Sequence, residues 1–172
     1  KIAYVQTGGT IDKDYPRGES DHGYAFEIAT PASKDVLKES FSVLEYEVYT
    51  VLKKDSLDIS ETDRDTIFEF VSSLKEQKVV ITHGTDTMFQ TAQRLSPISW
   101  KTVILTWAML PEKFKTSDAR FNIGMATAAV QILNPWVYIA IYGQVVPYEE
   151  FPDVAEKFES QTLSTESIDY DG

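Results

Sequence analysis

The chain has 172 residues, of which 42% are hydrophobic and 25% are charged, and its formal net charge at pH 7 is −11. This composition is that of one globular domain with a real core, and the acidity argues against nucleic acid as a partner, because nucleic-acid binders present a basic face. The absence of cysteine excludes disulfides, thiolate metal sites and a cysteine nucleophile. No apolar run could span a bilayer and no secretory leader is recognised, so we expect a cytoplasmic protein without membrane contact.

Short apolar segments alternate with helical patterns along the chain. The segments expected to form strands are 2–6, 44–52, 78–82, 102–107 and 136–142. The segments expected to form helices are 33–40, 60–77, 87–95 and 118–133, and Ser60 with Asp63 makes a good cap for the second helix. Most of the strands are nearly continuous apolar runs, as in a parallel sheet buried on both faces. The pattern therefore predicts a Rossmann-like or flavodoxin-like three-layer α/β domain with a mainly parallel sheet.

Two stretches lack this regular pattern. Residues 12–31 contain two prolines, two glycines and several charges, and a loop of this length in a compact domain is usually a functional lid or disordered. Residues 146–172 are strongly acidic. We expect them to form a solvated, partly mobile tail behind an α/β domain of residues 1–145.

The segment TGGT, residues 7–10, follows the first strand, at the edge of the sheet where ligands bind in open α/β folds. Gly8 and Gly9 permit a tight turn and a close backbone approach to a ligand. The pattern is neither G-x-G-x-x-G nor a P-loop, so a dinucleotide or a nucleoside triphosphate is not expected here. By itself, TGGT is more often an ordinary turn than a site.

The segment THGTDT, residues 82–87, gathers hydroxyl groups and a carboxylate around Gly84, which allows a sharp turn. Thr85 or Asp86 could cap the following helix, but a cap accounts for only one acceptor. A threonine hydroxyl beside a carboxylate could instead position a substrate, or take part in proton transfer if a base stands close. His83 is expected to be a buried, hydrogen-bonded histidine. No spacing of histidines or carboxylates indicates a metal site.

Four motifs together resemble the bacterial-type asparaginase/glutaminase family. They are TGGTI at 7–11, DSLDI at 55–59, THGTDT at 82–87, and AMLP at 108–111 followed by SDARFN at 117–122. They follow the family's order and approximate spacing over residues 1 to about 145. The resemblance implies the family's N-terminal α/β fold and hydrolysis of the side-chain amide of L-asparagine, sometimes L-glutamine, without a cofactor. Family members work as oligomers, so an amino-acid amide and copies of the same chain are the expected partners.

The resemblance also assigns roles to individual residues. Thr10 matches the family's threonine nucleophile, and Thr85 and Asp86 match a second threonine and an aspartate that also grips the substrate α-amino group. Family members also use a tyrosine on a flexible lid. This tyrosine is best matched by Tyr24, with Tyr15 as the alternative. The substrate-binding positions are matched by Ser56 for the carboxylate, Ala108 near the amide, and the turn glycines Gly9 and Gly84. Backbone N–H groups could steady the developing oxyanion.

Four departures from the family pattern accompany this resemblance. The sequence ends where the family's second domain, which supplies an acidic residue to a partner subunit, would begin. A lysine of the family is missing after the fifth strand, and Lys157 is the nearest candidate. Trp107 stands where the family usually has glycine, and its side chain either crowds the pocket or belongs to the core. Leu57 stands at a position that is often polar in the family. The alternative to an asparaginase-type enzyme is therefore a catalytically impaired amino-acid-binding or regulatory module, and a nucleotide-binding or interaction domain is the least favoured interpretation.

Overall fold

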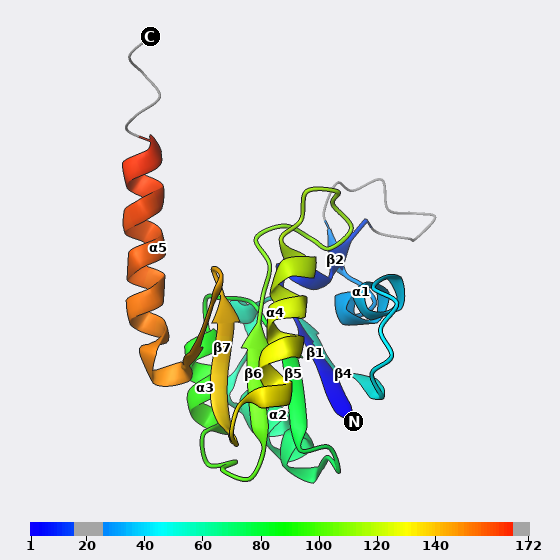
Figure 1. Ribbon diagram of the computed structural model, residues 1–172. Helices are drawn as coiled ribbons and strands as arrows, with labels where there is room; N and C mark the ends of the chain where they lie inside the picture. The colour runs from blue at the N-terminus through cyan, green and yellow to red at the C-terminus, as the bar shows by residue number, and fades with distance from the viewer. Residues whose placement is uncertain (16–25, 167–172) are drawn as a thin grey trace.

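A six-stranded sheet forms the centre of the protein, seen here in a computed structural model that describes residues 1–15 and 26–166, with side chains up to residue 162 (Figure 1). The strand order is β4-β1-β5-β6-β7-β8, and every neighbouring pair is parallel except β7 with β8. The strands are β1 Ile2–Gly8, β4 Tyr46–Lys54, β5 Lys78–Thr82, β6 Thr102–Thr106, β7 Trp136–Ile141 and β8 Gln144–Pro147. The predicted α/β fold with a mainly parallel sheet is confirmed.

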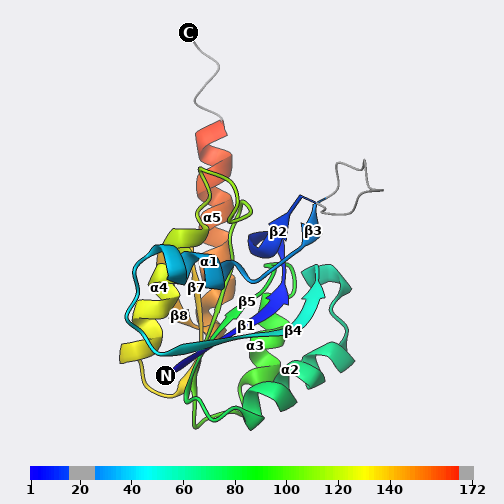
Figure 2. The ribbon, with the colours of Figure 1, turned by 90° about the vertical axis from the view of Figure 1, so that its right-hand side faces the viewer.

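Helices cover both faces of this sheet (Figures 1 and 2). One face carries α1 Ala32–Glu39 and α4 Ala119–Ile132, and the other carries α2 Glu61–Ser73, α3 Met88–Leu95 and the start of α5 Phe151–Glu166. The smaller elements are the 3₁₀ turns η1 Thr10–Asp12, η2 Ser56–Asp58 and η3 Tyr148–Glu150, and the antiparallel pair β2 Lys13–Asp14 and β3 Glu27–Ile28. None of the helices in the described parts of the chain is long and apolar enough to cross a membrane.

The four central strands β1, β5, β6 and β7 are largely apolar on both faces because they lie between two helical layers. In β5, Val79 and Ile81 pack toward α2 and α3, whereas Val80 packs toward α4. This arrangement explains the continuous apolar runs in the sequence. The predicted cap of α2 is also present, since Ser60 Oγ accepts a hydrogen bond from Asp63 N at 3.2 Å and Asp63 Oδ2 accepts one from Ser60 N at 2.8 Å.

The acidic C-terminal region contains more regular structure than a tail. Strand β8 runs across the boundary expected at residue 145, and Phe151 and Val154 of α5 are buried in the core. Phe158 stacks on Tyr142 with ring centroids 3.8 Å apart. Beyond this contact α5 runs past the carboxyl ends of the strands and away from the body of the protein (Figure 1). Phe151, Val154, Ala155 and Phe158 thus attach the first part of α5 to the body of the protein.

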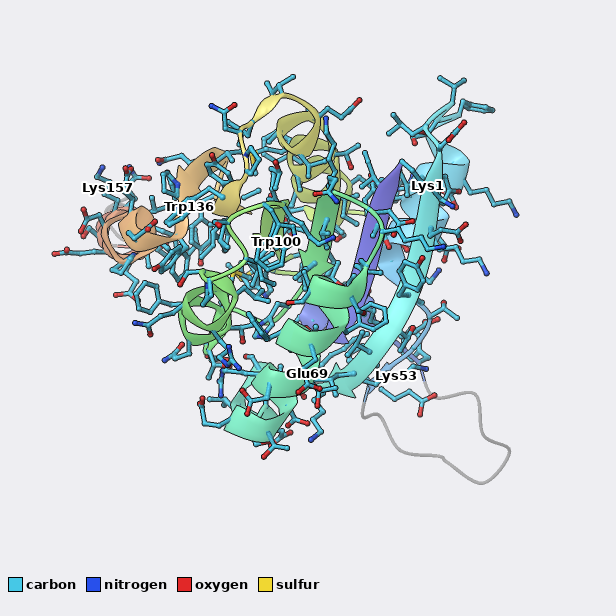
Figure 3. All side chains as sticks on the ribbon, turned by 90° about the horizontal axis from the view of Figure 1, so that it is seen from below. Lys1, Lys53, Glu69, Trp100, Trp136 and Lys157 are labelled. Carbon is cyan, nitrogen blue, oxygen red and sulfur yellow. The ribbon has the colours of Figure 1, made fainter. Side chains whose placement is uncertain are left out.

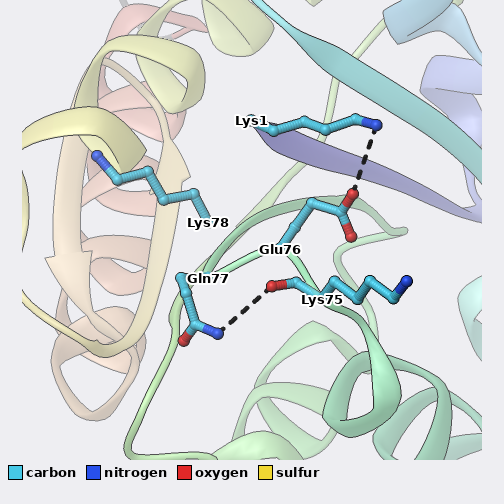
Figure 4. A pocket seen from close by; sticks show the side chains of 5 residues that line it. All are labelled: Lys1, Lys75, Glu76, Gln77 and Lys78. Carbon is cyan, nitrogen blue, oxygen red and sulfur yellow. Dashed lines mark hydrogen bonds and ion pairs between the residues drawn. The ribbon is translucent and has the colours of Figure 1, made fainter.

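A separate pocket opens at the opposite end of the sheet, where β1 and β5 begin. Its volume is about 410 Å³, and it is lined by Lys1, Lys75, Glu76, Gln77 and Lys78 (Figure 4). Lys1 Nζ lies 2.8 Å from Glu47 Oε1 and 4.0 Å from Glu76 Oε1. The carboxyl ends of the strands, where the sequence places a site, are at the other end of the molecule.

Candidate active site

The turns that follow β1, β4 and β5 meet at the carboxyl ends of three adjacent strands. A Cβ atom on Gly9 would lie 2.6 Å from Gly84 N, and a Cβ atom on Gly84 would lie 2.6 Å from Ser56 Oγ. Such distances leave no room for a side chain at either glycine. The two glycines therefore allow the turn with Thr10, the turn with Ser56 and the loop after β5 to touch one another.

The TGGT turn has the backbone conformation that its glycines permit. Gly8 and Gly9 have φ values of +121° and +90°, a region that other L-residues rarely adopt. The Gly9 N–H donates to the Lys54 carbonyl at 3.1 Å. The predicted tight turn is confirmed, and the close approach it makes is to the protein's own backbone at the end of β4.

Ser56 and Asp86 form the polar centre of this cluster. Ser56 Oγ donates a hydrogen bond to Asp86 Oδ2 at 3.0 Å, and the Thr87 hydroxyl donates to the Ser56 carbonyl at 2.7 Å. The capping interpretation of Thr85 and Asp86 is wrong: the N-cap of α3 is Thr87, and no side chain caps this helix. Ser56 is buried, whereas the Asp86 carboxylate is exposed at the surface of the cluster.

Both candidate threonines have hydroxyl groups available for chemistry. Thr10 lies in η1 and Thr85 in the loop after β5, and both are half-buried. Among the residues that the structure describes, neither hydroxyl has a hydrogen-bond partner. Ala108 is fully buried and packs in one cluster with Ile11, so the segment after β6 lies beside the Thr10 turn. The structure thus brings Thr10 and Ala108 to the same end of the sheet as Ser56, Thr85 and Asp86.

The lid tyrosine cannot be placed in the same way. Tyr24 lies outside the described residues. The alternative, Tyr15, is 63% exposed, and its ring lies against Phe26 with centroids 5.0 Å apart. The assignment of Tyr24 therefore stays a prediction from the sequence.

His83 is a buried structural residue, as expected. Its Nδ1 lies 2.7 Å from the Gly84 carbonyl oxygen, and its Nε2 lies 2.8 Å from Thr91 Oγ1. Burial lowers the pKa of His83 to about 4, so the imidazole is neutral at physiological pH. Its hydrogen bonds fix the loop that carries Thr85 onto α3.

Asp12 belongs to the site and was missed by the sequence reasoning. It is 2% exposed, and its carboxylate accepts hydrogen bonds from Thr82 Oγ1 at 2.8 Å and from Ala32 N at 2.7 Å. Burial raises the pKa of Asp12 to about 6, although these hydrogen bonds act in the opposite direction. The only signal in the sequence was its position directly after TGGTI, in a stretch without regular pattern.

Trp107, Lys157 and Leu57, the residues at which the sequence departs from the family pattern, lie in different parts of the structure. Trp107 is 8% exposed and belongs to the core, where its ring meets Tyr142 edge-on with centroids 5.9 Å apart, so the core interpretation is correct. Lys157 lies on α5 beyond the β8 edge of the sheet, whereas Lys53 lies on β4 at the opposite edge (Figure 3). Leu57 is exposed in η2.

Two ammonium groups near the cluster, those of Lys13 and Lys54, are engaged elsewhere. Lys13 Nζ pairs with Asp55 Oδ1 at 2.9 Å, and Lys54 Nζ pairs with Asp63 Oδ2 at 2.8 Å. Within the described parts of the chain, Asp86 is paired with Ser56 rather than with a lysine.

No three His, Asp or Glu residues in those parts are grouped so that they could hold a metal ion.

Comparison with known proteins identifies the family. A family model described as asparaginase, N-terminal, matches residues 1–163. The L-asparaginase of Thermococcus kodakarensis is 30% identical over 158 residues, a match that covers 85% of this chain and 45% of that protein. The chain therefore spans about half the length of this relative.

Solved structures agree with this match. The probable cytoplasmic L-asparaginase from Campylobacter jejuni has a TM-score of 0.70 at 27% identity, and the match covers 87% of this chain and 48% of that one. The thermostable L-asparaginase from Thermococcus kodakarensis also has a TM-score of 0.70 at 27% identity, over 86% of this chain and 45% of that one. L-asparaginase I from Vibrio cholerae, at 23% identity, shares the fold with a TM-score of 0.68 over 86% of this chain and 46% of that one. The chain belongs to the asparaginase family, of which it represents the N-terminal domain.

Proposed function

We propose that this chain hydrolyses the side-chain amide of L-asparagine to L-aspartate and ammonia, with Thr10 as the nucleophile. The observation that best supports this function is the contact between Gly9 and Gly84, since a Cβ on Gly9 would lie 2.6 Å from Gly84 N. This contact sets the turn of Thr10 against the loop of Thr85 and Asp86. Neither threonine hydroxyl is committed to another described residue.

The reaction divides into two steps. In the first, the Thr10 oxygen attacks the amide carbon while its proton moves through Thr85 or a water to the amide nitrogen. The C–N bond breaks, ammonia leaves, and an ester joins Thr10 to the aspartyl group. In the second, water attacks the ester carbon, L-aspartate leaves, and the proton returns to Thr10. Backbone N–H groups of these turns other than that of Gly9, which donates to the Lys54 carbonyl, stabilise the oxyanion in both steps.

The substrate head group is held by the polar centre of the cluster. The exposed carboxylate of Asp86 binds the α-ammonium group, and Ser56 binds the α-carboxylate when its hydroxyl, which donates to Asp86 in this structure, turns to the substrate. Tyr24 closes over the amide in this proposal. Residues Ala108, Gly9 and Gly84 shape the pocket around it. The proposed reaction needs no cofactor. The cytoplasmic location of the protein and its assembly from identical subunits stay predictions from the sequence.

A second candidate function is amino-acid binding without turnover. It is favoured by the pairing of Asp86 with Ser56, because a lysine that could assist proton transfer does not contact this carboxylate among the described residues. In this case L-aspartate or L-asparagine would stabilise the fold, but no ammonia would form.

Ammonia release and thermal stability separate the two functions. We expect the wild-type chain to release ammonia from L-asparagine, and Thr10→Ala and Thr85→Ala to abolish release while L-aspartate still raises Tm. Thr66→Ala is the matched control, because this exposed threonine of α2 donates only to the Thr62 carbonyl. Activity that survives both site substitutions rejects the mechanism, and a wild-type Tm shift without ammonia favours the binding module.

A further inference from the structure

Asp12 connects the turn of Thr10 to two other parts of the structure. Its Oδ2 accepts from the Thr82 hydroxyl of β5, and its Oδ1 accepts from the backbone N–H of Ala32, the first residue of α1. The carboxylate is buried, and its two partners lie at the end of β5 and at the start of α1. Both of these hydrogen bonds are buried.

The backbone of Asp12 is engaged as well. Its N–H donates to the Gly9 carbonyl at 3.2 Å, which closes the η1 turn around Thr10, and its carbonyl accepts from Ala29 N at 2.9 Å. A further hydrogen bond joins the ends of β1 and β5, because Thr7 Oγ1 donates to the Thr82 carbonyl at 2.7 Å. The position of Thr10 is thus fixed by a residue whose partners lie on two other elements.

Thr82 leads directly into the second half of the site. His83 and Gly84 follow it, and Thr85 and Asp86 come next. A hydrogen bond from Thr82 to Asp12 therefore sets the distance between the turn of Thr10 and the loop of Thr85. A small displacement of catalytic groups is costly, since a shift of about 1 Å can reduce a rate about 100-fold.

We propose that Asp12 is a positioning residue that holds Thr10 in register with Thr85 and Asp86 by binding the Thr82 hydroxyl and the start of α1. This role rests on the proposed function. A carboxylate suits it, because it accepts from two donors at once, whereas the amide of asparagine has only one acceptor oxygen. If that oxygen stays on Ala32 N, the amide nitrogen faces Thr82, whose hydroxyl must rotate to accept. Asp12→Asn therefore preserves the size of the residue but changes the tie to β5.

Few charged groups act on this carboxylate. The side-chain amide of Gln6 on β1 and the ammonium group of Lys53 on β4 both favour its ionised form. Among the described residues these groups act on Asp12 together with Thr82 and Ala32. Burial raises the pKa of Asp12 to about 6. The hydrogen bond from Thr82 is therefore made to a carboxylate above this pH and to a carboxylic acid below it.

A pair of threonine substitutions separates positioning from stability. Thr82 and Thr106 are register partners on β5 and β6, both are buried, and the Thr106 hydroxyl donates to the Ala140 carbonyl at 2.8 Å. Thr82→Val and Thr106→Val each remove one buried hydrogen bond at the same level of the sheet. We expect similar losses of Tm, but a fall in kcat of about tenfold or more only for Thr82→Val and Asp12→Asn, with KM within about twofold. Equal kcat losses in the two valine variants, or an unchanged kcat in Asp12→Asn, would overturn the proposal.

A measurement that needs no turnover tests Asp12 even if the wild-type chain releases no ammonia. In amide NMR spectra, the Thr10 and Thr85 resonances should shift with a common midpoint near pH 6, and Asp12→Asn should remove both transitions. Failure of the ammonia assay alone would reject the proposed function and leave this test intact. Persistence of the transitions in Asp12→Asn, or Thr10 and Thr85 amide resonances that this substitution leaves unchanged at every pH, would reject the positioning role.

Discussion

The hydroxyl of Ser56 donates a 3.0 Å hydrogen bond to the carboxylate of Asp86, joining the turn after β4 to the loop after β5. These are the two groups assigned to the α-carboxylate and the α-ammonium of the substrate. Their contact joins residues 30 positions apart in the sequence, so the proposed function places the charged head group of the substrate at this pair.

Ser56→Ala should weaken substrate binding more than it slows the reaction. A hydrogen bond to a charged group contributes about 1.5–3 kcal/mol, and the exposure of Asp86 reduces this to the low end. We therefore expect KM for L-asparagine to rise about tenfold with little change in kcat. Steady-state kinetics checks this, with Ser60→Ala as the control, because Ser60 only caps α2. A large kcat loss with normal KM would contradict the binding role.

Gly84→Ala and Gly124→Ala should have opposite effects on stability. A Cβ on Gly84 would lie 2.6 Å from Ser56 Oγ, so alanine there should lower the free energy of unfolding by about 1–3 kcal/mol and abolish activity. Gly124 is exposed in the middle of α4, and a Cβ there would meet nothing within 4 Å. Alanine should raise stability there by about 0.5–1 kcal/mol. Urea denaturation measures both, and a tolerated Gly84→Ala would show that the turns need not touch.

His83→Gln should change how stability depends on pH. The pKa of His83 is about 4 in the folded protein and 6.5 ordinarily, so the unfolded chain binds more protons between these values. The stabilising contribution of neutral His83 is therefore complete above pH 6.5 and is lost as the pH falls toward 4. The buried Asp12, with its raised pKa, has the opposite dependence, but it is present in both proteins and cancels in their difference.

The measurement is the difference in unfolding free energy between wild type and His83→Gln at several pH values. We expect the penalty of the substitution to shrink by up to about 1.4 kcal/mol per pH unit below pH 6.5. A difference that does not vary with pH would show that His83 titrates normally in the folded state.

Lys101→Met should destabilise the protein without affecting the site. Lys101 is 1% exposed, and its Nζ donates to the carbonyls of Leu74 and Glu76 at 2.5 and 2.7 Å, where α2 has ended. Loss of these bonds should lower the free energy of unfolding by about 1–3 kcal/mol. Lys78→Met is the control, since Lys78 makes an exposed bond to Gln131 O and should cost less than about 1 kcal/mol. A change in KM for Lys101→Met would connect this end of the sheet to the site.

The parallel sheet was predictable because its strands are runs of apolar β-branched residues. Each predicted strand is present, with ends displaced by at most two residues. Strand β8 was missed because it has only four residues and ends in proline, and α5 was missed because few apolar residues attach it to the core. Its acidic composition resembles that of a solvated terminus.

The site was only partly predictable for a different reason. Motif order placed Thr10, Ser56 and Thr85 at strand ends, but the sequence could not show that Gly84 is required by the Ser56 side chain rather than by a turn. Nor could it show the role of Asp12, whose partners Ala32 and Thr82 are 20 and 70 residues away. Contacts between distant segments are set by the fold, and no local pattern records them.

The most direct test of the central claim is the release of ammonia from L-asparagine by the purified 172-residue chain, measured together with the formation of L-aspartate. We predict equal amounts of the two products and a loss of about 100-fold or more in Thr10→Ala, with Thr66→Ala behaving as wild type. An absence of ammonia from the folded wild-type chain, or turnover that survives in Thr10→Ala, would contradict hydrolysis through Thr10.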